Sequence, residues 1–326
     1  MIKNKSILVF GGAGYLGRHI ADRYVENNKI IVYSRDENKH FLMNLKFNNH
    51  PNITYIVGDV RDSNKIRQTL LRVNPHIIIL AAALKHIEKC EVESDQCVSV
   101  NITGTQNVLN EIEYNQKSLN NLENVIFIST DKSVSPVNLY GQCKAVSEGL
   151  VVEKSIYIKN IQFKNVRYGN VLNSSGSILC VLHEQGKNPE FKNFTLTHKN
   201  MTRFLMTVED SIDLIEYAIL YADSGDTVIP RLMSCKMLDL FEIFSEIYNK
   251  PVVVTQIRPG EKLLESLINE TQSMRLIIDP NGYMRIKPHY FKQPITDTDF
   301  VKDYNSTINP MSKDELKKYL TDLKLI

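Results

Sequence analysis

The first apolar run of the chain is SILVF at residues 6–10, and it leads through GGAGYLG at 11–17 into RHIADRYVENN at 18–28. The first segment is typical of a strand buried on both faces, and the last has the apolar spacing of an amphipathic helix. Gly11, Gly14 and Gly17 lie between them, where a tight turn brings backbone N–H groups and a helix N-terminus against a diphosphate. A glycine pattern alone also fits a simple turn that needs positive φ. The flanking strand and helix favour a dinucleotide site.

Further short β-branched runs alternate with segments of helical period. This alternation predicts βαβ units and a parallel sheet. The predicted strands after the first are KIIVY at 29–33, ITYIV at 53–57, HIIIL at 76–80 and NVIFIS at 124–129.

The alternation breaks down after about residue 170, where Gly-, Pro- and Asn-rich loops intervene. The expected fold is α/β, a Rossmann-type doubly wound parallel sheet with a smaller C-terminal cap that binds substrate. Residues 1–168 would form the nucleotide-binding domain, with contributions from about 204–230. Residues 169–326 would mainly form the cap.

Composition excludes several classes of protein. The net charge is only +2, with acidic and basic residues interspersed, so a nucleic-acid partner is not expected. The five cysteines are scattered and odd in number, which favours neither a disulfide framework nor a metal site and fits the reducing cytoplasm. The longest apolar run, HIIILAAAL at 76–84, is far shorter than the ~20 residues of a membrane helix, so no membrane partner is expected.

The end of the second predicted strand bears on which dinucleotide binds. Ser34 and Arg35 stand where NAD enzymes of this fold usually place an acidic residue for the ribose. A guanidinium suits a 2′-phosphate that no acidic residue opposes, so we expect NADP; an exposed surface arginine is the alternative. The other residues predicted to contact the cofactor, some of which could equally serve ordinary packing, are Tyr15, Leu16, Asp59, Val60, Ala81, Ala82 and Ala83.

A second informative stretch, STDKSVSPVNLYGQCK at 129–144, follows the fifth predicted strand. Tyr140 and Lys144 are four residues apart, so in a helix they lie on one face. A lysine ammonium and a cationic nicotinamide near a phenol lower its pKa from the usual ~10 and make it a base for a sugar hydroxyl. The alternative is an ordinary amphipathic helix start, because this spacing is common by chance.

These stretches, with five others, resemble the extended short-chain dehydrogenase/reductases, and within them the soluble UDP-N-acetylglucosamine 4,6-dehydratases that invert C5. The resemblance extends over nearly the whole chain. It rests, in order, on GGAGYLG, VYSRDE, AAALKH, STDKSVSPVNLYGQCK, VRYGNV, MTRF and IRPGEK.

The resemblance implies roles for single residues. Tyr140 would be the base at the sugar, Lys144 its ribose-binding partner, and Thr130 a hydrogen-bond partner near the 4-oxygen. Asp131 would protonate the departing 6-hydroxyl, and Lys132 would remove the C5 proton. Lys132 must be neutral to do so, and nearby positive charge would promote this. The residues implied in binding the UDP-sugar are Lys85, Asn170, Thr197, Arg203, Arg258 and Glu261.

The resemblance also implies tightly bound NADP, UDP-N-acetylglucosamine as substrate and a homo-oligomer. Asn173 and Ser175 depart from it, since Gly and Arg are frequent there. Two other functions are possible on the same fold: a UDP-hexose 4-epimerase, which needs no acid and base at C6 and C5, and an NADP-binding regulator without catalysis.

Overall fold

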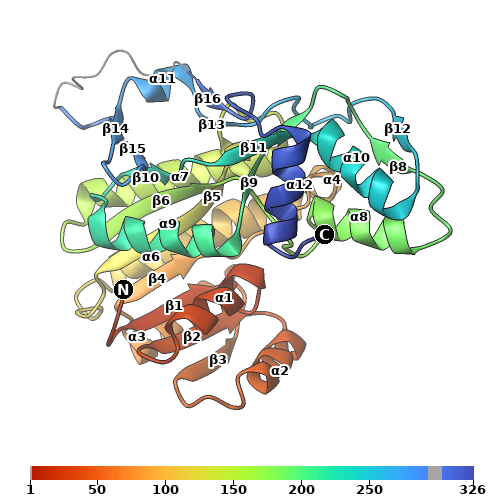
Figure 1. Ribbon diagram of the computed structural model, residues 1–326. Coiled ribbons are helices and arrows are strands. Elements are labelled where there is room, and N and C mark those ends of the chain that lie inside the picture. Colours follow the sequence, from red (N-terminus) through yellow and green to blue (C-terminus); the bar gives the residue numbers. More distant parts are fainter. Residues whose placement is uncertain (1, 293–302) are drawn as a thin grey trace.

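The computed structural model describes residues 2–292 and 303–326 and is built around one nine-stranded sheet (Figure 1). Neighbouring strands from β3 to β10 run parallel, and two antiparallel strands extend the sheet beyond β10. The predicted doubly wound α/β fold is confirmed. In spatial order the strands are β14 (Leu276–Ile278), β15 (Met284–Ile286), β10 (Thr227–Ile229), β6 (Gln162–Tyr168), β5 (Asn124–Thr130), β4 (Ile77–Leu80), β1 (Ser6–Phe10), β2 (Lys29–Ser34) and β3 (Ile53–Val57).

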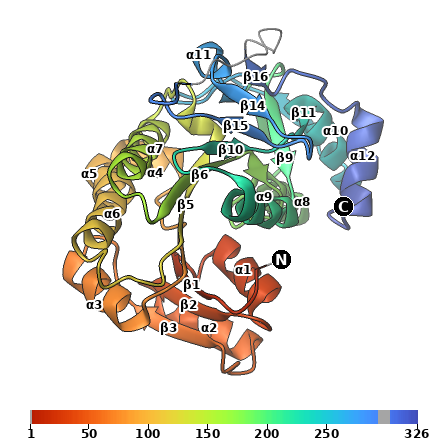
Figure 2. The ribbon, with the colours of Figure 1, turned by 90° about the vertical axis from the view of Figure 1, so that its left-hand side faces the viewer.

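Helices cover both faces of this sheet, as Figure 2 shows in a view turned by 90°. One face packs against α3 (Ser63–Val73), α6 (Gly104–Tyr114) and α7 (Leu139–Tyr157). The other packs against α1 (Tyr15–Tyr24) and α9 (Val208–Tyr221). The strands therefore contribute apolar side chains to two separate cores, which explains why their sequences are apolar at nearly every position.

A smaller group of elements encloses a third apolar core and corresponds to the predicted cap. In Figure 1 α8, α10, α12, β8 and β12 lie together on the right of the molecule. The members are α8 (Ile178–Lys187), β8 (Phe194–Leu196), α10 (Met237–Tyr248), β12 (Val252–Val254) and α12 (Lys313–Asp322).

Shorter elements connect the sheet with this group. A three-stranded sheet has the order β11-β9-β7, and β13 pairs with β16. The bounds are β7 (Asn170–Val171), β9 (Thr202–Met206), β11 (Met233–Lys236), β13 (Ser266–Ile268), β16 (Tyr304–Asn305), α2 (Glu37–Lys46), α4 (Ile87–Val92), α5 (Ser94–Val98), the π-helix η1 (Ser99–Thr103), the 3-10 turn η2 (Asp131–Ser133) and α11 (Glu270–Ser273).

Parts of the chain after residue 168 return to the main sheet. From 204–230, α9 packs on it and β10 pairs with β6. The strands β14 and β15 also join it, although the predicted boundary assigns them to the cap. The division into two domains therefore stays a prediction.

Arg167 forms a buried ion pair on the sheet and also hydrogen-bonds to this later part of the chain. Arg167 on β6 donates from Nε and Nη2 to the Glu148 carboxylate at 2.9 and 2.7 Å. Its Nη1 donates to the Leu267 carbonyl oxygen at 2.8 Å.

Among residues 2–292 and 303–326, no helix is both long and apolar enough to cross a membrane.

Candidate active site

The glycine turn lies at the carboxyl end of β1 and leads directly into α1. Gly11 has φ of 82°, and its N–H donates to the Tyr33 carbonyl oxygen at 2.8 Å. A Cβ at Gly11 would lie 2.7 Å from the Ala82 nitrogen, so only glycine brings the turn this close to the end of β4. Gly14 is the N-cap of α1, and among the described residues no side chain caps this helix end. The N-terminus of α1 therefore offers N–H groups suited to a diphosphate.

The remaining predicted cofactor contacts follow the neighbouring strands. Asp59 and Val60 follow β3, and Ala81–Ala83 follow β4, so they reach the same edge of the sheet as the glycine turn. These positions fit a dinucleotide laid across the carboxyl ends of the strands. The contacts themselves stay predictions.

The surroundings of Arg35 differ from the expectation in one respect. Its Nη1 lies 3.7 Å from Asp59 Oδ2, so an acidic residue does stand beside it. Arg61 binds the same carboxylate more closely, with Nη2 2.6 Å from Oδ2. The three groups together leave one net positive charge. Asp36 caps the N-terminus of α2, because its carboxylate accepts a hydrogen bond from the Lys39 N–H.

The predicted acid and base lie side by side in η2, directly after β5. Lys132 Nζ donates to Asp131 Oδ1 at 3.0 Å, and the Thr130 hydroxyl donates to the same oxygen at 2.9 Å. Asp131 is completely buried, and no described residue hydrogen-bonds its Oδ2. A buried carboxylate oxygen without a protein partner is costly unless a ligand satisfies it, so Asp131 is oriented to act on one.

The start of α7 brings Tyr140 to this turn. The Asn138 side chain caps the helix by accepting from the Gly141 N–H at 2.8 Å. A Cβ at Gly141 would collide with the Lys132 carbonyl oxygen, so glycine permits the helix to pack directly on η2. Tyr140 is therefore held beside Asp131 and Lys132.

The electrostatics of Tyr140 and Lys144 correct one expectation. Burial raises the pKa of Tyr140 well above its usual value, and the charge of Lys132 and a hydrogen bond with Thr130 oppose this. Lys144 instead donates to the Ile128 carbonyl oxygen at 2.7 Å and lies over the Phe127 ring. Burial lowers the pKa of Lys144 to about 8. Within the protein, Lys132 rather than Lys144 is the cation that acts on Tyr140.

A second correction concerns Lys132, which was expected to be neutral. Burial lowers its pKa, but the negative charges of Asp131 and Glu265 outweigh this and raise it above the ordinary value. Lys132 Nζ lies 3.5 Å from Glu265 Oε1. Sequence reasoning missed Glu265, because only the fold brings it to η2. Its proximity to the IRPGEK stretch was the one available signal.

The loop that contains IRPGEK lies against the catalytic turn. Asn138 donates from its side-chain amide to the Gly260 carbonyl oxygen, and Lys262 Nζ donates to the Val134 carbonyl oxygen at 2.6 Å. Arg203, predicted to bind the UDP-sugar, donates instead to the carbonyl oxygens of Thr202 and Lys262 at 2.8 and 2.9 Å. In this arrangement Arg203 holds the loop, and its contact with substrate stays a prediction.

Two other predicted substrate residues share a pocket in the cap. Thr197 and Arg258 line a cavity of about 320 Å³, in which apolar side chains face hydroxyl and amide groups. Arg258 also pairs with Glu261, whose Oε1 lies 3.4 Å from Arg258 Nε. The mixture of apolar and polar groups suits a nucleoside. The other lining residues are Ile178, Val181, Leu182, Gln185, Thr195, Phe241, Thr255 and Gln256.

The loop after β7 explains one departure from the resembling pattern. Asn173 has φ of 55°, a left-handed conformation that asparagine tolerates better than most residues, so it fits where glycine is frequent. The Ser175 carbonyl oxygen accepts from Lys85 Nζ at 2.8 Å. Lys85 contacts this loop, and Asn170 lies on β7 just before it. The contacts of both residues with the sugar stay predictions.

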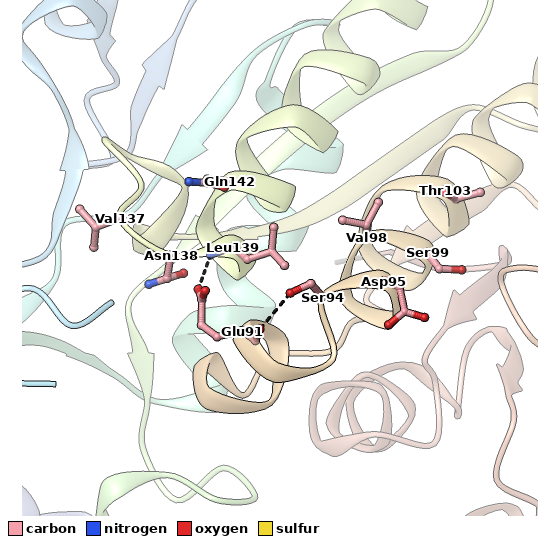
Figure 3. Close-up of a pocket in the computed structure, with 10 residues that line it drawn as sticks. All are labelled: Glu91, Ser94, Asp95, Val98, Ser99, Thr103, Val137, Asn138, Leu139 and Gln142. Atoms are coloured by element: carbon pink, nitrogen blue, oxygen red, sulfur yellow. Dashed lines mark hydrogen bonds between the residues drawn. The ribbon is translucent and has the colours of Figure 1, made fainter. Parts of the chain in front are cut away.

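A larger hollow of about 600 Å³ lies between α4, α5 and the start of α7 (Figure 3). Glu91 lies in it and accepts a hydrogen bond from the Leu139 N–H at 2.7 Å. The residues that line it include none of the predicted catalytic, cofactor or substrate residues. Its size therefore does not mark it as the reaction site.

Comparison with known proteins agrees with these features. The family described as polysaccharide biosynthesis protein matches residues 7–288. The chain belongs to this family. The inverting UDP-N-acetylglucosamine 4,6-dehydratase of Campylobacter jejuni is 34% identical over 330 residues, which cover 95% of each chain. The UDP-glucose 4-epimerase of Rickettsia bellii is 32% identical over 345 residues, which cover 100% of this chain and 98% of the relative.

The fold is also found among solved structures. The X-ray structure of Pen from Bacillus thuringiensis matches with a TM-score of 0.87 and 28% identity, covering 99% of both chains. The predicted membership in the extended short-chain dehydrogenase/reductases is confirmed. This polysaccharide biosynthesis protein is thus an enzyme of the nucleotide-sugar 4,6-dehydratase and 4-epimerase group, on a fold that uses NAD or NADP.

Proposed function

We propose that the chain is an NADP-dependent UDP-N-acetylglucosamine 4,6-dehydratase that inverts C5. The observation that carries this proposal is the contact of 3.0 Å between Lys132 and the fully buried Asp131, next to Tyr140. An epimerase acts only at C4 and has no use for an acid and a base at C6 and C5. A dehydratase needs both.

The residues can carry the steps in turn. When bound, NADP would accept hydride from C4 and return it to C6. Tyr140 removes the proton of the 4-hydroxyl, and the C4 ketone then acidifies the C5–H bond. A proton passes from Lys132 to Asp131 along their contact, which yields an amine base and a carboxylic acid. Lys132 takes the C5 proton, and Asp131 protonates the 6-hydroxyl as it leaves as water. As C6 receives hydride, a proton from solvent enters C5 on the opposite face, and Tyr140 gives the proton of the 4-hydroxyl to solvent.

This sequence of steps explains the raised pKa of Lys132. The ammonium is the stable form before and after each turnover, because Asp131 and Glu265 surround it. Only the transfer of its proton to Asp131 makes the reactive pair. The acid and the base therefore form in one proton transfer, and that proton is not released to bulk water.

The cap completes the site in this proposal. The pocket with Thr197 and Arg258 would take the uridine end, and Lys85, Asn170, Arg203 and Glu261 would contact the diphosphate and sugar. A UDP-hexose 4-epimerase is the second candidate, because relatives of that name match over the full chain. Assembly into a homo-oligomer and a cytoplasmic location belong to the same proposal.

One incubation separates the candidates. UDP-N-acetylglucosamine and UDP-glucose are supplied separately in heavy water, and products are read by NMR at early times. The dehydratase gives a 4-keto-6-deoxy sugar of L-configuration with deuterium at C5. A substrate deuterated at C4 delivers its label to C6. Formation of the C4 epimer, with C6 unchanged, would overturn the proposal in favour of the epimerase.

A further inference from the structure

Glu265 is a buried carboxylate that the reaction steps above do not use. Its side chain is only 4% exposed, and it lies where the segment after IRPGEK meets the catalytic turn. Its backbone N–H donates to the Ser306 hydroxyl at 3.0 Å, which fixes the start of the β13 segment. No described residue hydrogen-bonds its Oε2. A buried carboxylate oxygen without a hydrogen-bond partner is expensive, so a structural role alone accounts for it poorly.

The charges that face Glu265 come from several elements. Lys132 Nζ lies 3.5 Å from Oε1, and Lys262 Nζ lies 3.8 Å from Oε2. Arg203 Nε on β9 lies 3.9 Å from Oε1. Asp131 adds a like charge, and Tyr140 on α7 interacts with the charge of Lys132. The cluster therefore holds two carboxylates around Lys132 Nζ, with Arg203 and Lys262 at its edge.

We propose that Glu265 is a positioning residue for the acid and base pair: it holds Lys132 Nζ against Asp131 and keeps it in the ammonium form that supplies the proton to Asp131. This inference rests on the proposed dehydratase function. The charge of Glu265 stabilises the Lys132 ammonium, so the proton that Asp131 needs stays within the pair until elimination. The proton comes from Lys132, so total charge is conserved. After elimination, the new ammonium on Lys132 again lies beside two carboxylates.

The pair of variants Glu265→Gln and Glu265→Asp tests the charge separately from the shape. Gln keeps the size and removes the charge. Asp keeps the charge but, being one methylene shorter, places it farther from Lys132. Glu270→Gln is the matched control, since Glu270 is exposed in the same segment and lies outside the cluster. Thermal unfolding of each full-length variant establishes that it folds.

The first readout needs no substrate. Acetic anhydride labels neutral amines, and the side chain of Lys132 is 20% exposed, so peptide mass spectrometry can follow its labelling rate at fixed pH. Removing one negative charge lowers the pKa of Lys132, so Glu265→Gln should label about tenfold faster, which corresponds to a shift of about one unit. Lys132 should label more slowly in Glu265→Asp and in Glu270→Gln than in Glu265→Gln. The labelling of buried Lys144 should stay constant, which excludes a general loosening of the site.

The second readout is catalytic. Glu265→Gln should lower kcat for UDP-N-acetylglucosamine about tenfold with KM nearly unchanged, and should move the decline of kcat at high pH to lower pH. If wild-type protein does not turn over this substrate, the proposed function fails while the labelling still decides the role of Glu265. Equal labelling of Lys132 in wild type and Glu265→Gln would overturn the inference. If Glu265→Gln does not fold, Glu265→Asp takes its place: its carboxylate lies farther from Lys132, so Lys132 should label faster than in wild type, and equal labelling would overturn the inference.

Discussion

The two sides of the active site treat their lysines in opposite ways. On the sheet side, Lys144 lies between a backbone carbonyl oxygen of β5 and the ring of Phe127, and burial lowers its pKa to about 8. On the cap side, Lys132 lies 3.0 Å from Asp131 and 3.5 Å from Glu265, and these charges raise its pKa. Lys144 is buried, whereas the side chain of Lys132 is 20% exposed.

The difference follows from where the partners come from. Both lysines lie in one contiguous piece of chain, β5, η2 and α7, and the contacts of Lys144 within it are with a carbonyl oxygen and an aromatic ring. The cap side receives Glu265, Lys262 and Arg203 from distant segments, and these supply fixed charge. These later segments therefore set part of the charge around η2.

The largest effect expected is on the sheet side. Tyr140→Phe should lower turnover about 10³-fold, because no other described side chain at this site is placed as the base for the 4-hydroxyl. The bound cofactor should stay oxidised, which its absorbance reports. Binding of UDP-N-acetylglucosamine, measured by calorimetry, should be nearly unchanged. Appearance of reduced cofactor in this variant would show that another group starts the reaction.

The corresponding change on the cap side should act at a later step. Lys132→Ala should lower turnover by about 10²-fold or more, because the base for C5 is lost. Oxidation at C4 should continue, so some reduced cofactor should accumulate, and deuterium exchange at C5 should cease. Full dehydration by a folded Lys132→Ala protein would assign the C5 base to another residue and erase the contrast between the two sides.

The sheet side was also the part that the sequence predicted well. The runs SILVF and ITYIV coincide with β1 and β3, and the predicted starts or ends of β2, β4 and β5 differ by one residue. Strands buried on both faces and a glycine turn are local patterns, so they are visible without the fold. Tyr140 and Lys144 lie four residues apart on α7, as the sequence predicted, and their pairing in function stays a prediction.

The cap side could not be predicted in the same way. Glu265 meets Lys132 only because β13 packs beside η2, and nothing in LLES at 263–266 distinguishes it from a surface residue. The same holds for Arg203. Its guanidinium donates to the carbonyl oxygens of Thr202, Lys262 and Leu263, and the last two belong to a distant loop. The pKa expectations for Tyr140 and Lys132 counted nearby cations and omitted burial and the second carboxylate, which act in the opposite direction in the protein without cofactor.

The low pKa of Lys144 predicts a pH dependence of stability. An unfolded lysine titrates near 10.5 and the folded one near 8, so between these values the unfolded chain binds more protons. Stability should therefore rise with pH across this window, and the contribution of Lys144 corresponds to about 3 kcal/mol. Denaturant unfolding of wild type and Lys144→Met, compared from pH 7.5 to 10.5 in about half-unit steps, isolates this term. Parallel curves for the two proteins would contradict the assignment.

The smallest effect expected is at the edge of the nucleotide site, where Arg35 is more than half exposed. Arg35→Ala should weaken NADP by about 1.5–3 kcal/mol, the range for hydrogen bonds to a charged group, and leave NAD nearly unchanged. Arg61→Ala sharpens the test, because it frees the Asp59 carboxylate that Arg61 binds at 2.6 Å. That freed charge should repel a 2′-phosphate and favour NAD. Arg67→Ala, an exposed change on α3, serves as the control. Calorimetric titration of each protein with both dinucleotides measures the preference. Equal affinity of wild type for NAD and NADP would contradict the expected preference for NADP and indicate that the charge of Asp59 cancels that of Arg35.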